Sequence, residues 1–254
     1  MSKRSQMKKT GAAGFLLLTC LYFFLSASAK AQSAVDDSAL YRKSISRAIS
    51  IYHLAVAEQA GLFNGSQYAN YPFHFAEDGF PYFKDPKTGR GSVTYDGILY
   101  ENLHLQYDEV QEVVMMEDSA RRIQLLNQRI SEFTVFDNLF IRIVKDSTTR
   151  PLIRTGFYNV LYAGRHTLLK KEEKIVREEV GRDEILHFID VNRYYYVKND
   201  NDWYSIKTKN GILNLFRDRK KELRQYIRKN NLSYKKDRDN MLIKVTAYYD
   251  QLTK

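Results

Sequence analysis

The residues best suited to chemistry are histidines and carboxylates, and their spacing favours no particular reaction. The chain has five histidines, which are His53, His74, His104, His166 and His187. No two of them stand at metal-ligand spacing and no H-E-x-x-H segment occurs, so the sequence predicts no metal site. His74 with Glu77 and Asp78 comes closest to an acid–base group. Because these three fall in a loop-rich stretch, we interpret them as a surface trio.

Motifs that bind phosphate or activate a nucleophile are also missing from the sequence. No G-x-S-x-G segment, phosphate loop or dinucleotide fingerprint is found, and Gly89-Arg90-Gly91 is too short to cradle a phosphate. The acidic pairs at 172–173 and 178–179 alternate with Lys and Arg, which is typical of a solvated strand surface. A glycosidase-type carboxylate pair stays open, since its members need not be sequence neighbours. We therefore expect no catalytic residue, no cofactor and no enzyme activity.

The first 31 residues have the order of a secretory signal peptide. A basic start precedes the apolar run Gly11–Leu25, and the small-x-small site Ala29-Lys30-Ala31 stands just before Gln32. Cleavage between Ala31 and Gln32 would remove Cys20, the only cysteine, so we expect no disulfide. A lipidated Cys20 is the alternative reading, although the apolar run continues beyond it. The sequence thus predicts export to the periplasm or the outer-membrane periphery, with no membrane span after cleavage.

A basic segment at the C-terminus is the strongest charge feature. Residues 206–254 contain 14 Lys/Arg against 5 Asp/Glu, whereas residues 32–205 contain 21 against 25. The candidate contacts for an anionic partner are Arg217, Arg219, Lys220, Lys221, Arg224, Arg228 and Lys229. These cations form either a solvated helix face or a contact for anionic lipid, lipopolysaccharide or an acidic envelope protein. Nucleic acid is not expected, because an exported chain rarely meets it and no groove-reading motif is present.

Helical and loop signals precede the strand-rich part of the chain. Residues 36–60 have apolar side chains at helical spacing, and residues 62–91 are rich in Gly, Pro and aromatic residues. The candidate ligand-contacting rings of this loop are Tyr68, Tyr71, Phe73, Phe80, Tyr82 and Phe83. The loop is either a folded cap that buries its rings on a sheet or a lid over a ligand.

From Ser92 the apolar period changes to two. Asp96-Gly97 stands between β-favouring residues and predicts a tight hairpin. Short strand-like runs, among them Gly156–Ala163, follow to Lys207 and are separated by turn residues such as Asp137-Asn138, with no helix between them. This pattern predicts a mainly β (α+β) fold, with a curved antiparallel meander or partly open barrel.

Helical spacing returns over Lys209–Asn230 and Lys236–Leu252, which predicts a basic helical hairpin packed on the sheet. We therefore divide the chain into a signal peptide (1–31), an N-terminal helix and aromatic loop (32–91), a β-meander (92–207) and a helical hairpin (208–254).

Three segments resemble a signature of an uncharacterised family of secreted cell-envelope proteins of Bacteroidota. They are Tyr95–Asn102 (YDGILYEN) followed by Leu105-x-Tyr107-Asp108, Gly156–Gly164 (GFYNVLYAG), and Lys221–Asn230 (KELRQYIRKN). The resemblance implies a cell-envelope setting and brings no active site to transfer.

The sequence thus favours a non-enzymatic envelope protein whose sheet and basic helices act as an interaction platform. A periplasmic carrier of a lipid or other apolar ligand is the alternative, because a curved sheet under an aromatic lid can enclose a cavity. An envelope hydrolase ranks third.

Overall fold

The computed structural model describes residues 41, 43–48, 50–51, 62, 65–118, 121–145, 153–200 and 202–253. The predicted signal peptide and its cleavage site lie outside these residues, as does most of the predicted helix over 36–60. The chain divides into two units, Met1–Ile45 and Ser46–Lys254, and the fold described below is that of the second. Among the described residues, no helix is both long and apolar enough to cross a membrane.

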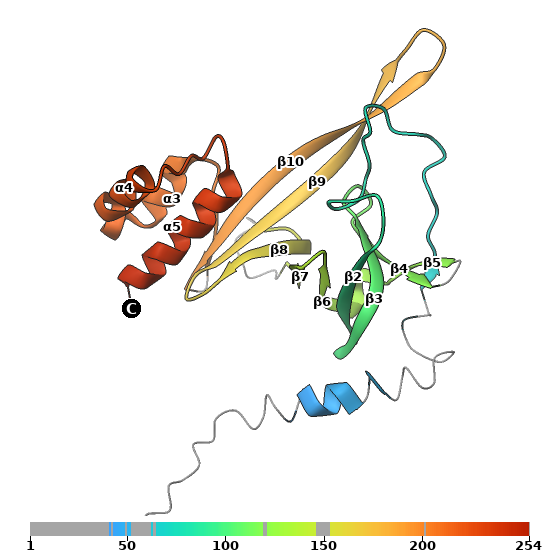
Figure 1. The fold of residues 1–254 in the computed structure, drawn as a ribbon, viewed down its shortest axis with the longest axis horizontal. Helices are drawn as coiled ribbons and strands as arrows, with labels where there is room; N and C mark the ends of the chain where they lie inside the picture. The colour runs from blue at the N-terminus through green and yellow to red at the C-terminus, as the bar shows by residue number, and fades with distance from the viewer. Residues whose placement is uncertain are drawn as a thin grey trace, which may run out of the picture. The chain divides into compact units, whose positions relative to one another are not determined.

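The second unit is built on one antiparallel sheet of eleven strands (Figure 1). The strands are β1 (Ser66–Gln67), β2 (Gly89–Tyr95), β3 (Ile98–Asp108), β4 (Val113–Asp118), β5 (Arg121–Gln124), β6 (Ile130–Val135), β7 (Asn138–Ile143), β8 (Gly156–Ala163), β9 (Thr167–Val180), β10 (Ile185–Asn199) and β11 (Asp202–Ser205). The prediction of a mainly β, antiparallel fold is confirmed. The sheet is not closed, and β1 and β11 form its two edges.

The strand order departs from a simple meander at two places, because β6 pairs with β2 and not with β5, and β1 pairs with β5 and not with β2. A 3-10 turn over Asn127–Arg129 joins β5 to β6. Arg129 makes an ion pair with Asp96 in the β2–β3 turn, and its carbonyl accepts a hydrogen bond from the Asp96 N–H at 2.8 Å. These contacts hold the start of β6 beside the end of β2, while β1 takes the free edge of β5.

Two tight turns show how sequence sets strand register. Asp96 and Gly97 have φ values of 51° and 78° between the paired residues Tyr95 and Ile98, which confirms the predicted hairpin. The predicted turn at Asp137-Asn138 is wrong by one residue. Phe136 and Asp137 take the positive φ positions, at 49° and 58°, because Asn138 already pairs with Val135 as the first residue of β7.

Apolar side chains from β2 to β8 form one core of stacked and edge-on rings. The Phe133 and Phe140 rings stack at 4.7 Å between centroids, and Phe157 meets Phe133 edge-on at 5.2 Å. Val93, Leu105 and other buried side chains of these strands belong to the same core. Ring contacts of this kind stabilise the sheet by more than the burial of apolar area alone, because they favour particular ring orientations.

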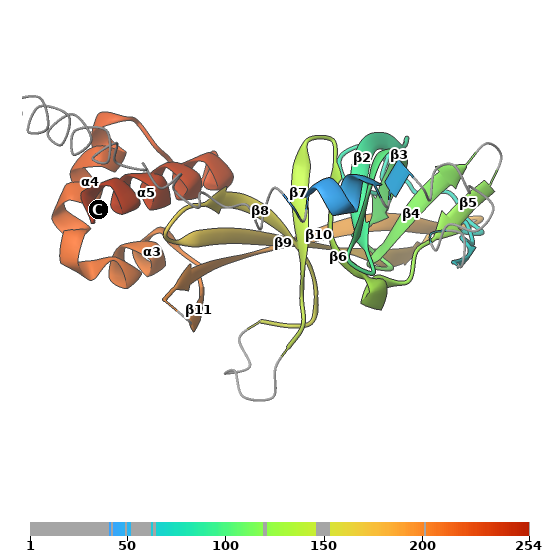
Figure 2. The same ribbon diagram turned by 90° about the horizontal axis from the view of Figure 1, so that it is seen from below.

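The C-terminal helices α3 (Lys209–Leu215), α4 (Lys220–Lys229) and α5 (Arg238–Leu252) lie together beside β8, β9 and β10 (Figure 2). Their apolar sides form a second core with residues of β9 and β10, including Leu168 and Val197. The predicted single helix over 209–230 is wrong at Phe216, which leaves the helical conformation with φ −97° and ψ 47°. That break places the buried Phe216 ring in a stack on Tyr249 at 3.8 Å.

Candidate functional site

The basic helix α4 presents most of the predicted cations on one exposed surface. Leu223 and Ile227 are buried in the second core, so the opposite side of the helix faces solvent. A depression of about 440 Å³ lies on that side. Its basic lining comprises Arg217, Lys220, Lys221, Arg224 and Arg228, which we call the α4 surface. The other two predicted cations, Arg219 and Lys229, are exposed, and Arg219 pairs with Glu222 at 3.4 Å.

The first part of the aromatic loop is anchored to the sheet by a buried carboxylate. The Tyr68 hydroxyl donates to Asp108 Oδ2 at 2.7 Å, and the Tyr71 hydroxyl donates to the same oxygen at 2.9 Å. Asp108 Oδ1 accepts the backbone N–H groups of Val110 and Gln111, each at 2.8 Å. Burial raises the pKa of Tyr68, and its hydrogen bond to Asp108 raises it further. The two tyrosines therefore act as ties between the loop and β3.

The later rings of the loop also pack on the sheet. Phe73 stacks on His187 of β10 at 3.7 Å between ring centroids. Phe83 meets Phe140 edge-on at 4.9 Å and is 4% exposed, while Tyr82 forms an isolated bridge with Asp108. Of the six rings, only those of Phe80 and Phe83 line the cleft described next. The contacts are those of a folded cap.

A cleft of about 780 Å³ lies between the sheet, the aromatic loop and the start of α5. Its floor is one face of β9 and β10, which carries Val191, Tyr195 and four charged side chains, Lys170, Glu172, Lys174 and Arg193. The loop supplies Phe80, Phe83 and Lys84, and the α4–α5 link and first turn of α5 supply residues 234–239. Three segments distant in sequence therefore converge on one hollow.

The charged side chains of the cleft floor form ion pairs. Lys170 Nζ lies 2.8 Å from Asp239 Oδ2 and 3.7 Å from Glu172 Oε2, and the Glu172 carboxylate also accepts from Arg193 Nε at 2.9 Å. The Tyr195 hydroxyl donates to Asp239 Oδ1 at 2.5 Å. Burial would raise the pKa of Asp239, but the hydrogen bonds from Lys170 and Tyr195 outweigh it and lower the pKa. Within this group, the two cations Lys170 and Arg193 balance the two carboxylates of Glu172 and Asp239.

Lys174 of the cleft floor also contacts a buried carboxylate, that of Glu109. Its Nζ lies 3.4 Å from Glu109 Oε2 and donates to the carbonyls of Phe80 and Tyr82. The Glu109 side chain is 1% exposed, and its Oε2 has an ion-pair distance to Lys174 without hydrogen-bond geometry. Burial and the nearby Glu172 raise the pKa of Glu109 to about 7, although Lys174 acts in the opposite direction. Lys174 therefore holds the aromatic loop to β9.

The rim of the cleft is basic. Lys84, Lys235, Lys236 and Arg238 stand around it with one carboxylate, Asp237. Asp237 is the N-cap of α5 and accepts a hydrogen bond from the Asn240 N–H at 3.1 Å. The Arg238 guanidinium lies over the rings of Tyr234 and Tyr195, at 4.7 and 5.5 Å from their centroids. The cations of the rim thus outnumber its carboxylates.

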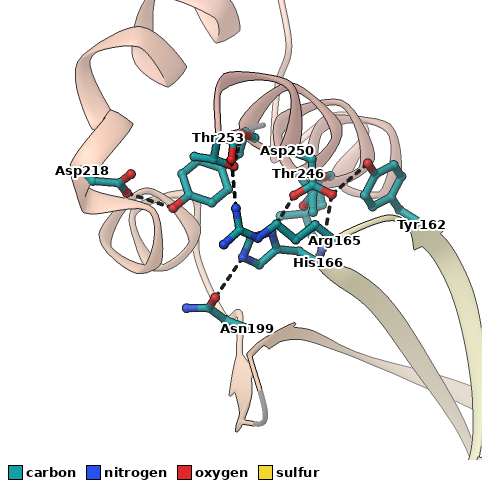
Figure 3. Close-up of polar contacts among 10 residues, drawn as sticks. Tyr162, Arg165, His166, Asn199, Asp218, Thr246, Asp250 and Thr253 are labelled. Atoms are coloured by element: carbon teal, nitrogen blue, oxygen red, sulfur yellow. Dashed lines mark hydrogen bonds and ion pairs between the residues drawn. The ribbon is translucent and has the colours of Figure 1, made fainter.

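His166 occupies a separate, buried network at the end of α5 (Figure 3). Its Nδ1 lies 2.5 Å from Asp250 Oδ1, and its Nε2 lies 2.9 Å from Asn199 Oδ1. The other Asp250 oxygen accepts from the Tyr162 hydroxyl at 3.0 Å and from the His166 backbone N–H at 3.2 Å. With His166 4% and Asp250 6% exposed, this group joins α5 to the β8–β9 turn and is closed to a substrate.

The remaining sequence candidates do not converge. His74, Glu77 and Asp78 are all exposed, as expected for a surface trio. The described residues contain no group of three or more His, Cys, Asp or Glu side chains that could hold a metal ion. No family model, curated protein or solved structure matches the chain in the comparisons with known proteins.

Sequence reasoning missed the cleft. Its interpretation of Glu172 as solvated is wrong, because that side chain is 15% exposed and pairs with two cations. The available signal was the alternation of Lys170, Glu172 and Lys174, which places three charges on one face of a strand. Their partners Asp239 and Arg193 come from other elements, and only the tertiary structure brings them together.

Proposed function

We propose that the protein is a non-enzymatic, exported cell-envelope protein that docks onto an anionic partner through the α4 surface. The observation that carries the proposal is the convergence of five Lys and Arg side chains on one depression. The acids Asp218 and Glu222 also line it, so five cations stand against two carboxylates, and Glu222 also pairs with Arg219. The depression therefore keeps a positive excess.

Electrostatic attraction is the mechanism of this contact. Each Lys or Arg near an anionic membrane surface contributes about 1 kcal/mol of binding free energy, so a net excess of three positive charges favours binding without any specific pocket. The apolar residues Leu223 and Ile227 of α4 are committed to the protein core and cannot enter the bilayer. Binding should therefore be peripheral and sensitive to salt, since screening weakens exposed charge contacts.

The export part of the proposal is supported by the leader-like order of residues 1–31 and by the resemblance to envelope proteins of Bacteroidota. It is tested by fractionating the native cell and sequencing the protein's N-terminus. A chain that begins at Gln32 in the envelope fraction would support the proposal, and an uncleaved chain in the cytosol would contradict it.

The carrier alternative has less support. The sheet is not closed, and the cleft beside β9 and β10 is lined mainly by charged side chains. An apolar ligand would leave these charges without water, at a free-energy cost that its own burial does not offset.

The docking surface is tested with vesicles of phosphatidylglycerol and of phosphatidylcholine. The protein should co-sediment with the anionic vesicles at about 50 mM salt and dissociate at about 500 mM. The double variant Arg224→Glu and Arg228→Glu reverses two exposed charges one turn apart on α4. It should weaken binding at least about tenfold, by the stated contribution of each charge.

A matched control reverses two exposed cations elsewhere, Lys87→Glu and Arg90→Glu. This control has the same net charge, so it should retain most of the binding. Equal loss in both variants would show that net charge alone drives association, and equal binding to both vesicle types would contradict the proposed anionic partner.

A further inference from the structure

We propose that the cleft between β9–β10 and the start of α5 is a second, separate binding site, for a small organic ligand that carries two neighbouring phosphate groups. The site does not overlap the α4 surface, since the two are lined by different residues. Its volume of about 780 Å³ lies within the ordinary range for small-molecule sites.

The charge of the rim matches such a ligand. Within the described part of the chain, no carboxylate pairs with Lys84, Lys235, Lys236 or Arg238, whereas the floor cations Lys170, Lys174 and Arg193 all have acidic partners. The four rim cations and Asp237 leave an excess of three positive charges. A phosphate monoester carries about −1.5 to −2 at neutral pH, so two phosphate groups balance that excess.

The kinds of side chain also favour phosphate over scattered carboxylates. Three of the four rim cations are lysines, whose ammonium groups act as mobile point charges suited to a compact, highly charged group. Arg238 is the exception, and its guanidinium is held over the Tyr234 and Tyr195 rings. A fixed guanidinium presents two parallel donors to one phosphate, while the lysines can close on its neighbour.

The walls leave room for the organic body of the ligand. Two phosphate groups fill only a part of the cleft, and Phe80 and Tyr234 offer apolar surface beside the charged floor. The floor itself is balanced by its own ion pairs and hydrogen bonds, so it holds its geometry before a ligand arrives. A preformed floor reduces the ordering cost of binding.

The test is isothermal titration calorimetry of the purified protein with pyrophosphate, orthophosphate and citrate at about 50 mM salt. Pyrophosphate should bind at least about tenfold more tightly than orthophosphate, because it engages two sets of cations instead of one. Citrate has a similar total charge spread over three carboxylates and should bind more weakly than pyrophosphate. Absence of pyrophosphate binding overturns the proposal, and equal affinity for citrate overturns the phosphate assignment.

Charge reversal then places the binding in the cleft. Lys235→Glu with Lys236→Glu, both on the α4–α5 link at the rim, should weaken pyrophosphate binding about tenfold or more. The control Lys87→Glu with Arg90→Glu makes the same charge change at exposed positions outside both candidate sites and should leave the affinity within about threefold. Equal loss in both variants means non-specific attraction and refutes the site.

A second rim variant distinguishes loss of the binding site from a folding defect in the α4–α5 link. Lys84→Glu comes from the aromatic loop and should weaken pyrophosphate binding in the same direction, with unchanged thermal unfolding. Vesicle binding keeps the two proposals apart, because the Lys235 and Lys236 variant should still bind anionic vesicles if only the cleft is altered. Unaltered pyrophosphate affinity in both folded rim variants would overturn the assignment.

Discussion

Replacing Glu109 by Gln tests the charge network behind the cleft. Glu109 is 4% exposed, and its pKa is raised from 4.5 to about 7 by burial and by the neighbouring Glu172, against the opposing effect of Lys174. The folded protein therefore holds a proton on Glu109 at pH values where the unfolded chain has released it. The contribution of this group to stability is fully present below about pH 4.5 and is lost as the pH rises through 7.

The size of the expected change in unfolding free energy follows from the raised pKa of Glu109. A difference of one pKa unit corresponds to about 1.36 kcal/mol, so this group should remove about 2.5 kcal/mol of unfolding free energy between about pH 5 and about pH 8. A glutamine side chain at this position cannot ionise and should remove that dependence. It also fills nearly the same volume, and the carbonyls of Phe80 and Tyr82 still accept from Lys174.

Urea unfolding at several pH values, followed by circular dichroism, measures the effect. The difference in unfolding free energy between the Glu109→Gln variant and the parent should change by about 2.5 kcal/mol in favour of the variant from about pH 5 to about pH 8. Glu101→Gln, at an exposed position of β3, is the matched control and should follow the parental curve. A pH-independent difference would refute the role of Glu109, and a change of opposite sign would show that Lys174 dominates its ionisation.

Two further substitutions test the core contacts. A Cβ at Gly91 would lie 1.9 Å from the Thr134 carbonyl oxygen, so Gly91→Ala should push β2 away from β6 and cost about 1–3 kcal/mol in urea unfolding; parental stability would contradict the β2–β6 pairing. Asp250→Ala leaves the His166 ring and the Tyr162 hydroxyl without their acceptor. We expect a loss of about 3 kcal/mol and a fall in Tm of roughly 6–12 °C by calorimetry, and a Tm within about 2 °C of the parent would contradict a structural role.

Local patterns in the sequence were sufficient to predict the class of fold and several of its elements. Asp96-Gly97 set a hairpin because both positions of its turn need positive φ, and the β8 bounds Gly156–Ala163 were predicted without error. Helical spacing likewise located the C-terminal helices. These features depend on residues within a few positions of one another, where propensity and periodicity act directly.

Non-local contacts decided the rest. The pairing of β6 with β2 brings Arg129 to Asp96, and the break at Phe216 brings its ring onto Tyr249. In each pair the two residues are far apart in the sequence, so no local pattern predicts their contact.

The same division holds for the two candidate sites. The sequence alone determined the α4 surface, because a run of cations on one amphipathic helix remains basic wherever the helix packs. The cleft was decided only by tertiary structure, since its floor depends on Lys170 meeting Asp239, 69 positions away. Whether a charged residue is solvated or paired depends on which distant group lies within a few ångströms, and chain folding alone sets that distance.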